Sequence, residues 1–274
     1  ARTDWRRLAI REALTLVGAR RLFQRWAPTN PVRQLAFRRV YFCSRFLRDS
    51  TARAGVEVIH GQVIPSPVDV HAFDGKPRGE DEPPARWLWA GRLSPDKGAA
   101  TALEALALLR DEFRGHLDIY GAGEDAYVDG LRAFTREHAL PVSFRAAEPA
   151  EMPAVYRAHD ALLFTSQWDE PFARTPLEAM ASGLPVIATT TGGSPELFRD
   201  RDNALTYTAG NPHELADRVR ELTRNGALRA RIAATGRAEV HTTYATDAIV
   251  DRIEDDLRET LRVWRPRAVP PYSA

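Results

Sequence analysis

The stretch RWLWAGRLSPDKGAATALEALALLRDEFRGHLDIYGAG, residues 86–123, decides the fold, because two short apolar runs flank one amphipathic segment. The runs 86–93 and 116–121 predict β-strands, and the segment 97–113 predicts a helix between them. A strand, a helix and a strand in this order form a βαβ unit, whose two strands lie parallel. The stretch therefore predicts a parallel sheet with helices on its faces.

The same alternation continues along the chain, so further strands are expected to join this sheet. The predicted strands are 141–146, 161–166, 185–190 and 204–209, and the predicted helices are 124–138, 150–159, 176–182 and 212–225, with a short helical turn at 194–198. Two more predicted helices, 228–240 and 247–264, follow. This alternation predicts an α/β fold with a doubly wound, Rossmann-like parallel sheet, which binds ligands at the carboxyl ends of its strands.

The composition is that of an ordinary globular protein. The chain has 274 residues, 38 Lys and Arg against 37 Asp and Glu, 44% hydrophobic residues and a single cysteine, Cys43. These values exclude a disordered, collagen-like or disulfide-stapled chain and allow one large or two modest domains. No apolar run reaches the roughly 20 residues of a membrane span, and the arginine-rich start lacks the apolar centre of a signal peptide. We therefore expect a cytoplasmic protein.

The first 53 residues are strongly basic. They hold thirteen arginines and three acidic residues, a formal charge of +10, whereas the rest of the chain has a formal charge of −9. Residues 3–26 carry large apolar side chains on one side of a helical projection and predict a basic amphipathic helix. Packing of this helix on its neighbour is the first interpretation and peripheral contact with an anionic membrane is the second. We expect no nucleic acid partner.

The segment that follows has its own short elements. Residues 39–44 predict a strand, 45–53 a helix and 57–64 a second strand, and the polar, proline-rich residues 74–84 predict a linker. The predicted organisation is therefore an N-terminal portion (1–84), a ligand-binding α/β domain (85–245), and a C-terminal helix with a loose tail (246–274).

Three polar loops follow predicted strands, so a doubly wound sheet would bring them to one edge. In the first, Arg92 and Lys97 flank the start of a predicted helix, whose free N–H groups favour an anion such as phosphate. In the second, Gly121 and Gly123 would let a ligand approach the backbone closely. The three loops are GRLSPDKG (91–98), GAGED (121–125) and WDEPFARTPLEAMASG (168–183).

The third loop holds two glutamates, Glu170 and Glu178, around the start of a helix with Thr175 as its N-cap and Pro176 as its first residue. Thr175 and Glu178 also match a capping box, in which Glu178 would only accept a backbone hydrogen bond. Glu170 could likewise be no more than a solvated loop residue. Together, however, the carboxylates, the two cations and the free N–H groups suit a sugar attached to a diphosphate.

These segments resemble the donor-binding half of the family 4 retaining glycosyltransferases, which have the GT-B fold. GRLSPDKG is similar to the family's phosphate-binding segment, and DEPFARTPLEAMASGLPVIATTTGGSPEL (169–197) is similar to its paired-glutamate motif and the turn that follows. The resemblance covers residues 86–221. It implies transfer of a sugar from a nucleotide-sugar donor to an acceptor hydroxyl of a glycan, a lipid or a small molecule, with no metal ion and no other cofactor.

The resemblance also implies roles for individual residues. Arg92 and Lys97 would hold the donor diphosphate and neutralise the leaving nucleotide. Glu170 would face the transferring sugar as the third catalytic residue, and Glu178 would bind the ribose. The other donor-binding residues would be Gly91, Gly121 and Gly123, the backbone N–H groups of Phe172, Ala173 and Arg174, then Thr175, and Arg145 close to the base. Glu196, in the matching turn, could contact the ligand or be structural.

The sequence departs from the family pattern in places. Ala173 stands where a glycine is common, and no glycine follows the predicted strand 141–146. Residues 39–73 resemble only the last strand, helix and strand of the acceptor domain, so we expect a truncated N-terminal portion, whose missing half was removed or comes from another chain. The activity of this chain alone stays open. Residues 247–264 resemble the helix that crosses back onto the acceptor domain.

Two other classes of protein compete with this interpretation. A non-catalytic homologue that binds a nucleotide or a partner protein through the open surface is the alternative. A dinucleotide-dependent oxidoreductase is disfavoured, because the first strand of the sheet leads into GRLSPDKG and not into G-x-G-x-x-G.

Overall fold

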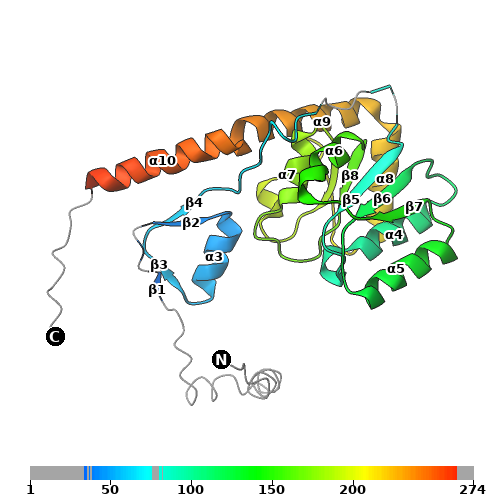
Figure 1. The fold of residues 1–274 in the computed structure, drawn as a ribbon, viewed down its shortest axis with the longest axis horizontal. Coiled ribbons are helices and arrows are strands. Elements are labelled where there is room, and N and C mark those ends of the chain that lie inside the picture. Colours follow the sequence, from blue (N-terminus) through cyan, green and yellow to red (C-terminus); the bar gives the residue numbers. More distant parts are fainter. Residues whose placement is uncertain (1–33, 36, 38, 76–79, 82, 264–274) are drawn as a thin grey trace, which may run out of the picture.

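The structure, a computed structural model, describes residues 34–35, 37, 39–75, 80–81 and 83–263. Its main element is a six-stranded parallel sheet with the strand order β10-β9-β8-β5-β6-β7 (Figure 1). This order confirms the predicted doubly wound α/β fold, because the chain builds the sheet outward from β5 in one direction and then from β8 in the other. The strands are β5 (Arg86–Ala90), β6 (His116–Tyr120), β7 (Val142–Arg145), β8 (Ala161–Phe164), β9 (Val186–Thr189) and β10 (Leu205–Tyr207).

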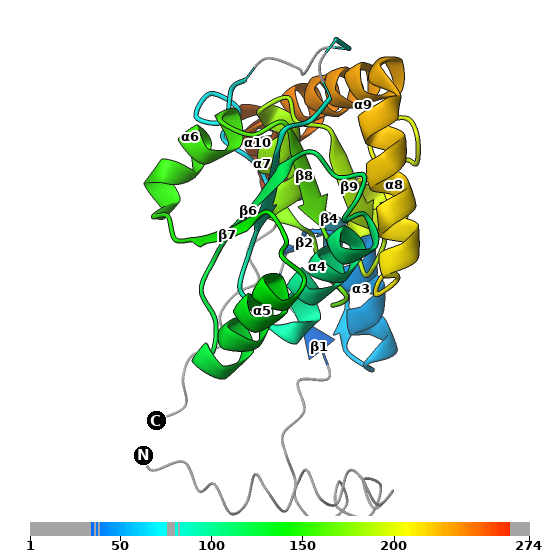
Figure 2. The same ribbon diagram turned by 90° about the vertical axis from the view of Figure 1, so that its right-hand side faces the viewer.

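Helices cover both faces of the sheet, because successive side chains of each strand point to opposite faces. Trp87, Leu117 and Leu163 pack in one core with α4, α5 and α8, whereas Leu88 and Leu162 pack in the other with α6 and α7. Figure 2 shows α6 and α8 on opposite sides of the strands. The helices are α4 (Ala99–Leu108), α5 (Asp125–Glu137), α6 (Met152–Arg157), α7 (Arg174–Ala181) and α8 (Pro212–Arg224).

Several predicted helices start or end elsewhere in the structure. The predicted helix 97–113 begins only at Ala99, because Gly98 adopts a left-handed conformation with φ of 71° that interrupts the helix after a 3-10 turn, Pro95–Lys97. The predicted helix 228–240 extends over α9 (Gly226–Glu239) and continues into a π-helical turn, Val240–Tyr244.

The described residues of the N-terminal portion form two small parallel sheets. The predicted helix 45–53 is confirmed as α3 (Arg45–Arg53), and it follows β2 (Val40–Phe42), which pairs with β4 (Gly61–Val63). The predicted strand 57–64 is divided, because β3 (Glu57–Val58) pairs instead with β1 (Gln34–Leu35). Residues 3–26, with their predicted helix and membrane contact, lie outside the described residues. Within the described part, no helix is long and apolar enough to cross a membrane.

The last helix, α10 (Thr246–Val263), leaves the sheet and runs over β2 and β4 (Figure 1). The backbone N–H of Thr246 donates to the carbonyl of Val68 at 3.1 Å. Further along, the Asp256 carboxylate accepts from the Tyr41 hydroxyl at 3.0 Å and forms an ion pair with Arg39 at 2.8 Å. Helix α10 therefore fastens the N-terminal portion to the body that contains the sheet.

Leu88, in the central strand β5, has no exposed surface, and Leu88→Ala should lower the free energy of unfolding by about 2–5 kcal/mol through lost burial and a residual cavity. Leu108→Ala removes the same atoms from a side chain that is 43% exposed and should cost no more than about 0.5 kcal/mol. Chemical unfolding of both variants measures the difference. Equal losses would contradict the assignment of Leu88 to the core.

Candidate functional site

The carboxyl edge of the sheet has its topological switch point between β5 and β8, which are neighbours although β6 and β7 lie between them in the sequence. The loops that follow these two strands bind each other. The Thr165 hydroxyl donates to the carbonyl of Lys97 at 2.9 Å and accepts from the Trp89 indole N–H at 2.8 Å. The N–H groups of Gln167 and Trp168 both donate to the carbonyl of Asp96, at 2.8 and 3.1 Å. Two of the predicted loops, 91–98 and 168–183, therefore meet at this point.

Glycines allow the loops to approach closely. A Cβ on Gly98 would overlap the carbonyl oxygen of Thr165, and a Cβ on Gly121 would overlap the carbonyl oxygen of Gly91. Gly123 lies in the same way against the carbonyl of Leu93. We predicted that Gly121 and Gly123 leave room for a ligand. In the structure the space next to their α-carbons is occupied by protein backbone, so packing of the loops already requires both glycines.

Lys97 and Glu170 form the centre of this site. The Lys97 ammonium forms an ion pair with Oε1 of Glu170, and the hydroxyl of Ser166 donates to the same oxygen at 2.9 Å. The two charged side chains are only 21% and 15% exposed. Ser166 was not predicted as a site residue, because a serine after a strand has no distinctive pattern in the sequence.

Arg92 lies further out than Lys97. Its side chain is 68% exposed, and its guanidinium lies 3.6 Å from Oδ2 of Asp96, which is also 3.9 Å from the Lys97 ammonium. A hydrogen bond from Ser94 is the largest cause that lowers the pKa of the Asp96 carboxyl, and the charges of Lys97 and Arg92 act in the same direction. The structure therefore places both predicted cations around one carboxylate oxygen.

The second predicted glutamate, Glu178, lies in α7. Its Oε2 accepts from the Tyr156 hydroxyl at 2.9 Å, and its Oε1 is 3.9 Å from the Arg174 guanidinium. Burial raises the pKa of the Glu178 carboxyl, while Tyr156 and Arg174 partly offset that effect.

The predicted N-cap at Thr175 is wrong. Helix α7 begins at Arg174, with Ala173 as an N-cap that makes no side-chain hydrogen bond. Ala173 is buried, and the ring of Phe172 packs 5.7 Å from the ring of Tyr244. This packing draws the chain into the helix earlier than the sequence pattern indicates. The capping-box interpretation of Glu178 fails for the same reason.

The turn after β9 supports the Glu170 loop from behind. The N–H of Gly193 donates to the carbonyl of Glu170 at 2.7 Å, and the N–H of Gly192 donates to the Asp169 carboxylate at 3.1 Å. In the same turn, the Glu196 carboxylate accepts from the backbone N–H groups of Arg45 at 3.0 Å and Phe46 at 2.8 Å. Glu196 therefore caps α3 and joins the turn to the N-terminal portion, a structural role.

Arg145, at the end of β7, is held by a buried carboxylate. Its guanidinium donates to Oδ1 of Asp118 at 2.6 Å, and His159 lies 3.1 Å from Oδ2 of the same carboxylate. Burial alone would raise the pKa of Asp118, but these two hydrogen bonds outweigh it and hold the pKa below its ordinary value. The sequence contained a signal for this network, since Asp118 interrupts an apolar strand. Strand β6 separates β7 from β5, so Arg145 lies two strand spacings, about 10 Å, from β5, and the switch point lies on the far side of β5.

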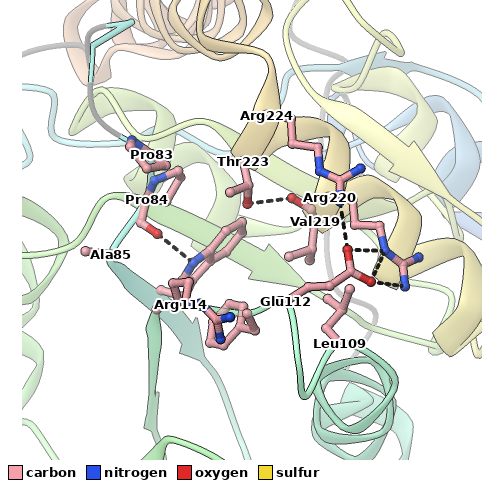
Figure 3. A pocket seen from close by; sticks show the side chains of 13 residues that line it. Pro83, Pro84, Ala85, Leu109, Glu112, Arg114, Val219, Arg220, Thr223 and Arg224 are labelled. Atoms are coloured by element: carbon pink, nitrogen blue, oxygen red, sulfur yellow. Dashed lines mark hydrogen bonds and ion pairs between the residues drawn. The ribbon is translucent and has the colours of Figure 1, made fainter.

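A pocket at the amino edge of the sheet, beside the starts of β5 and β6, contains none of the predicted site residues (Figure 3). Its apolar lining includes Trp87 and Val219. The indole N–H of Trp87 donates to the carbonyl of Pro84 at 3.2 Å. On its rim, the Glu112 carboxylate pairs with Arg220 at 3.0 Å and Arg224 at 2.9 Å. The indole and the Glu112 carboxylate thus have partners within the protein. In the ranges that the structure describes, no cluster of three or more His, Cys, Asp or Glu side chains could hold a metal ion.

Comparison with known proteins gives consistent results. Residues 72–239, more than half of the chain, match the sequence model of the family described as "Glycosyl transferases group 1". Spore coat protein SA of Bacillus subtilis is 30% identical over 180 residues, which are 61% of this chain and 46% of that protein. D-inositol 3-phosphate glycosyltransferase of Corynebacterium glutamicum is 32% identical over 178 residues, 61% of this chain and 42% of that protein.

Among solved structures, Alr3699/HepE of Anabaena in complex with UDP-glucose superimposes with a TM-score of 0.73 and 25% sequence identity. The similarity covers 80% of this chain and 63% of that chain. The chain spans about half the length of the curated relatives that it matches.

Gly98→Ala should lower the free energy of unfolding by about 1–3 kcal/mol, because alanine strains the left-handed backbone and its Cβ collides with Thr165. Gly130→Ala is the matched control, since this glycine lies in α5 with no atom within 4 Å of an added Cβ. The control should stabilise by about 0.5–1 kcal/mol through helix propensity. Chemical unfolding measures both, and a neutral Gly98→Ala would contradict the close contact of the two loops.

Asp118→Asn should cost about 1–3 kcal/mol at pH 7, because it removes the buried charge that binds Arg145 and His159. The pKa of Asp118 is lower in the folded state than in the unfolded state, so its contribution is complete above the unfolded pKa of about 3.9 and is lost as the pH falls through the folded value. The difference in unfolding free energy between wild type and Asp118→Asn should therefore shrink below about pH 4. Asp129→Asn, at a side chain that is 72% exposed, is the control and should show little difference at any pH. A gap that stays constant in acid would contradict the charged network.

Proposed function

The chain belongs to the group 1 glycosyl transferases, and from that premise we propose that it carries the nucleotide-sugar site of a retaining glycosyltransferase. The observation that carries this proposal is the meeting of Lys97 and Glu170 at the switch point between β5 and β8. Open α/β sheets bind their ligands at this place. A cation and a carboxylate side by side suit a donor whose diphosphate is anionic and whose sugar carries hydroxyl groups.

Three groups of the site suit the diphosphate. Lys97 and the more exposed Arg92 supply positive charge from one loop. On the opposite side, α7 begins without a side-chain cap, so the N–H groups of its first turn have no side-chain acceptor within the described residues. Such N–H groups bind phosphate oxygens well. The contacts of the Phe172–Arg174 backbone, Thr175, Gly91, Gly121 and Gly123 with the donor remain predictions.

Glu178 suits the ribose. Its carboxylate is largely buried, and Tyr156 occupies only one of its two oxygens with a hydrogen bond. A carboxylate of this kind accepts hydrogen bonds from the two neighbouring hydroxyl groups of a ribose. Hydrogen bonds to a charged acceptor are shorter and stronger than hydrogen bonds between neutral groups. Arg145 would lie on the base side, consistent with its position at the end of β7. Similar proteins support the donor class, since Alr3699/HepE was solved with UDP-glucose and a mannosyltransferase of Mycobacterium tuberculosis is named as GDP-mannose-dependent.

The chemistry needs charge stabilisation more than a nucleophile. The bond between the anomeric carbon and the diphosphate oxygen breaks, and the acceptor oxygen forms a bond to the same face while a phosphate oxygen takes its proton. Lys97 and Arg92 would stabilise the negative charge of the leaving diphosphate, and the Glu170 carboxylate would lie near the positive charge that develops on the sugar. The acceptor, the cytoplasmic location, the membrane contact of residues 3–26 and the absence of a metal ion or cofactor remain predictions.

Lys97→Ala and Glu178→Ala should each weaken the binding of a nucleoside diphosphate by about 1–3 kcal/mol, since each removes a charge-assisted hydrogen bond. Binding is measured by thermal unfolding and calorimetry with UDP, GDP and ADP, and NAD serves as the negative ligand. A nucleotide that binds, at a concentration of 100 times its dissociation constant, should raise the free energy of unfolding of wild type by about 2.7 kcal/mol.

The charge-matched controls are Arg110→Ala and Glu104→Ala, two exposed positions away from the site. Their affinities should match that of wild type. If the affinity of all four variants equals that of wild type, the assignment of Lys97 and Glu178 to the donor site is wrong.

A further inference from the structure

The Lys97 ammonium has two candidate partners. It forms an ion pair with Glu170 in the structure, and the proposed function assigns it to the donor diphosphate. We propose that the Lys97–Glu170 ion pair belongs to the donor-free state, and that a nucleoside diphosphate takes Lys97 from Glu170 when it binds. Glu170 keeps its hydrogen bond to Ser166 and becomes a free carboxylate beside the sugar. This inference rests on the proposed function of the site.

Contacts to one carboxylate oxygen make the exchange possible. Lys97 and Ser166 both bind Oε1 of Glu170. Within the part of the chain that the structure describes, no hydrogen bond reaches Oε2. When the lysine leaves, Ser166 still binds Oε1, and Oε2 accepts hydrogen bonds from a ligand.

The backbone of Glu170 does not need to move. Its N–H donates to the carbonyl of Trp168 at 2.7 Å, and its carbonyl accepts from the N–H of Gly193 at 2.7 Å. Ser166 is equally fixed, because it is buried and its carbonyl accepts from the Thr189 hydroxyl at 2.7 Å. The exchange therefore involves only the lysine side chain.

Lysine is suited to this movement. Its ammonium is a compact charge with three donors on a flexible stem, unlike the planar guanidinium of arginine. The ion pair is only 21% and 15% exposed, so separating it has a cost, which the hydrogen bond from Ser166 to Glu170 and the new contact of the ammonium with phosphate offset. A diphosphate carries more negative charge than one carboxylate and competes for the ammonium on favourable terms. Asp96, 3.9 Å from the ammonium, remains as a second partner during the exchange.

The exchange predicts an unusual sign for one substitution. Glu170→Gln keeps the shape of the side chain but releases Lys97, so UDP, GDP or ADP, whichever binds wild type best, should bind about threefold to tenfold more tightly. Calorimetry of wild type, Glu170→Gln, Lys97→Ala and the double variant forms a double-mutant cycle. In the Lys97→Ala background, Glu170→Gln should change the affinity by less than about twofold, because there is no lysine to release.

Two further variants complete the design. Asp169→Asn removes the neighbouring carboxylate, which binds the N–H of Gly192 and not a cation, and should change the affinity by less than about twofold. Glu170→Ala replaces Glu170→Gln if the latter does not fold, as judged by thermal unfolding without nucleotide. It should tighten binding in the same way, since it also releases the lysine.

The outcomes separate the exchange from the proposed function. If wild type binds a nucleotide and Glu170→Gln binds it no more tightly, the exchange is wrong and the donor site stands. If Glu170→Gln tightens binding equally with and without Lys97, the effect is simple repulsion between carboxylate and phosphate, and the exchange is again wrong. If none of the three nucleotides binds to any variant, the proposed function fails and the exchange fails with it.

Discussion

The close contact between backbones at the switch point is the constraint on which the rest of the site depends. Gly98 lies against the carbonyl of Thr165, and Gly121 lies against the carbonyl of Gly91, with no space for a side chain in either place. The loop after β5 is therefore held between the loops after β6 and β8. Because Lys97 directly precedes Gly98, this packing sets its position and brings its ammonium to Glu170, which is 73 residues away in the sequence.

The loop that contains Glu170 is connected to the N-terminal portion through the turn after β9. The turn that follows β9 supports the backbone of Glu170 through Gly193, and its Glu196 caps α3 by accepting two backbone hydrogen bonds. Helix α10 makes a second connection through Asp256 and Tyr41. The N-terminal portion is thus held by charged side chains at two separate places, by Glu196 from the carboxyl edge of the sheet and by Asp256 from α10.

Three carboxylates of the α/β domain differ in pKa and in binding partners because their surroundings differ. Asp118 is buried with a guanidinium and an imidazole, so its pKa is lowered and it serves as an anchor for Arg145. Glu178 is largely buried, which raises its pKa, and its two oxygens have different neighbours, the Tyr156 hydroxyl at 2.9 Å and the Arg174 guanidinium at 3.9 Å. Glu170 is as little exposed as Glu178, at 15% against 18%, but it pairs with a lysine, whose charge lies on a flexible stem. Within the described residues its Oε2 accepts no hydrogen bond, whereas Oε1 is bound by both Lys97 and Ser166.

The sequence by itself determined the fold class, because the periods of strands and helices are local properties that can be seen in any short window. It also determined that the loops 91–98, 121–125 and 168–183 share one edge, since parallel strands carry their carboxyl ends on the same side. The start of α7 could not be predicted, because burial of Phe172 and Ala173 overrode the cap signal at Thr175. Nor could the partners of Glu170, Glu196 and Arg145, which come from distant elements. These contacts could be seen only in the tertiary structure, because they depend on the order of the strands and on the close packing of the loops. Neither property produces a periodic pattern in the sequence.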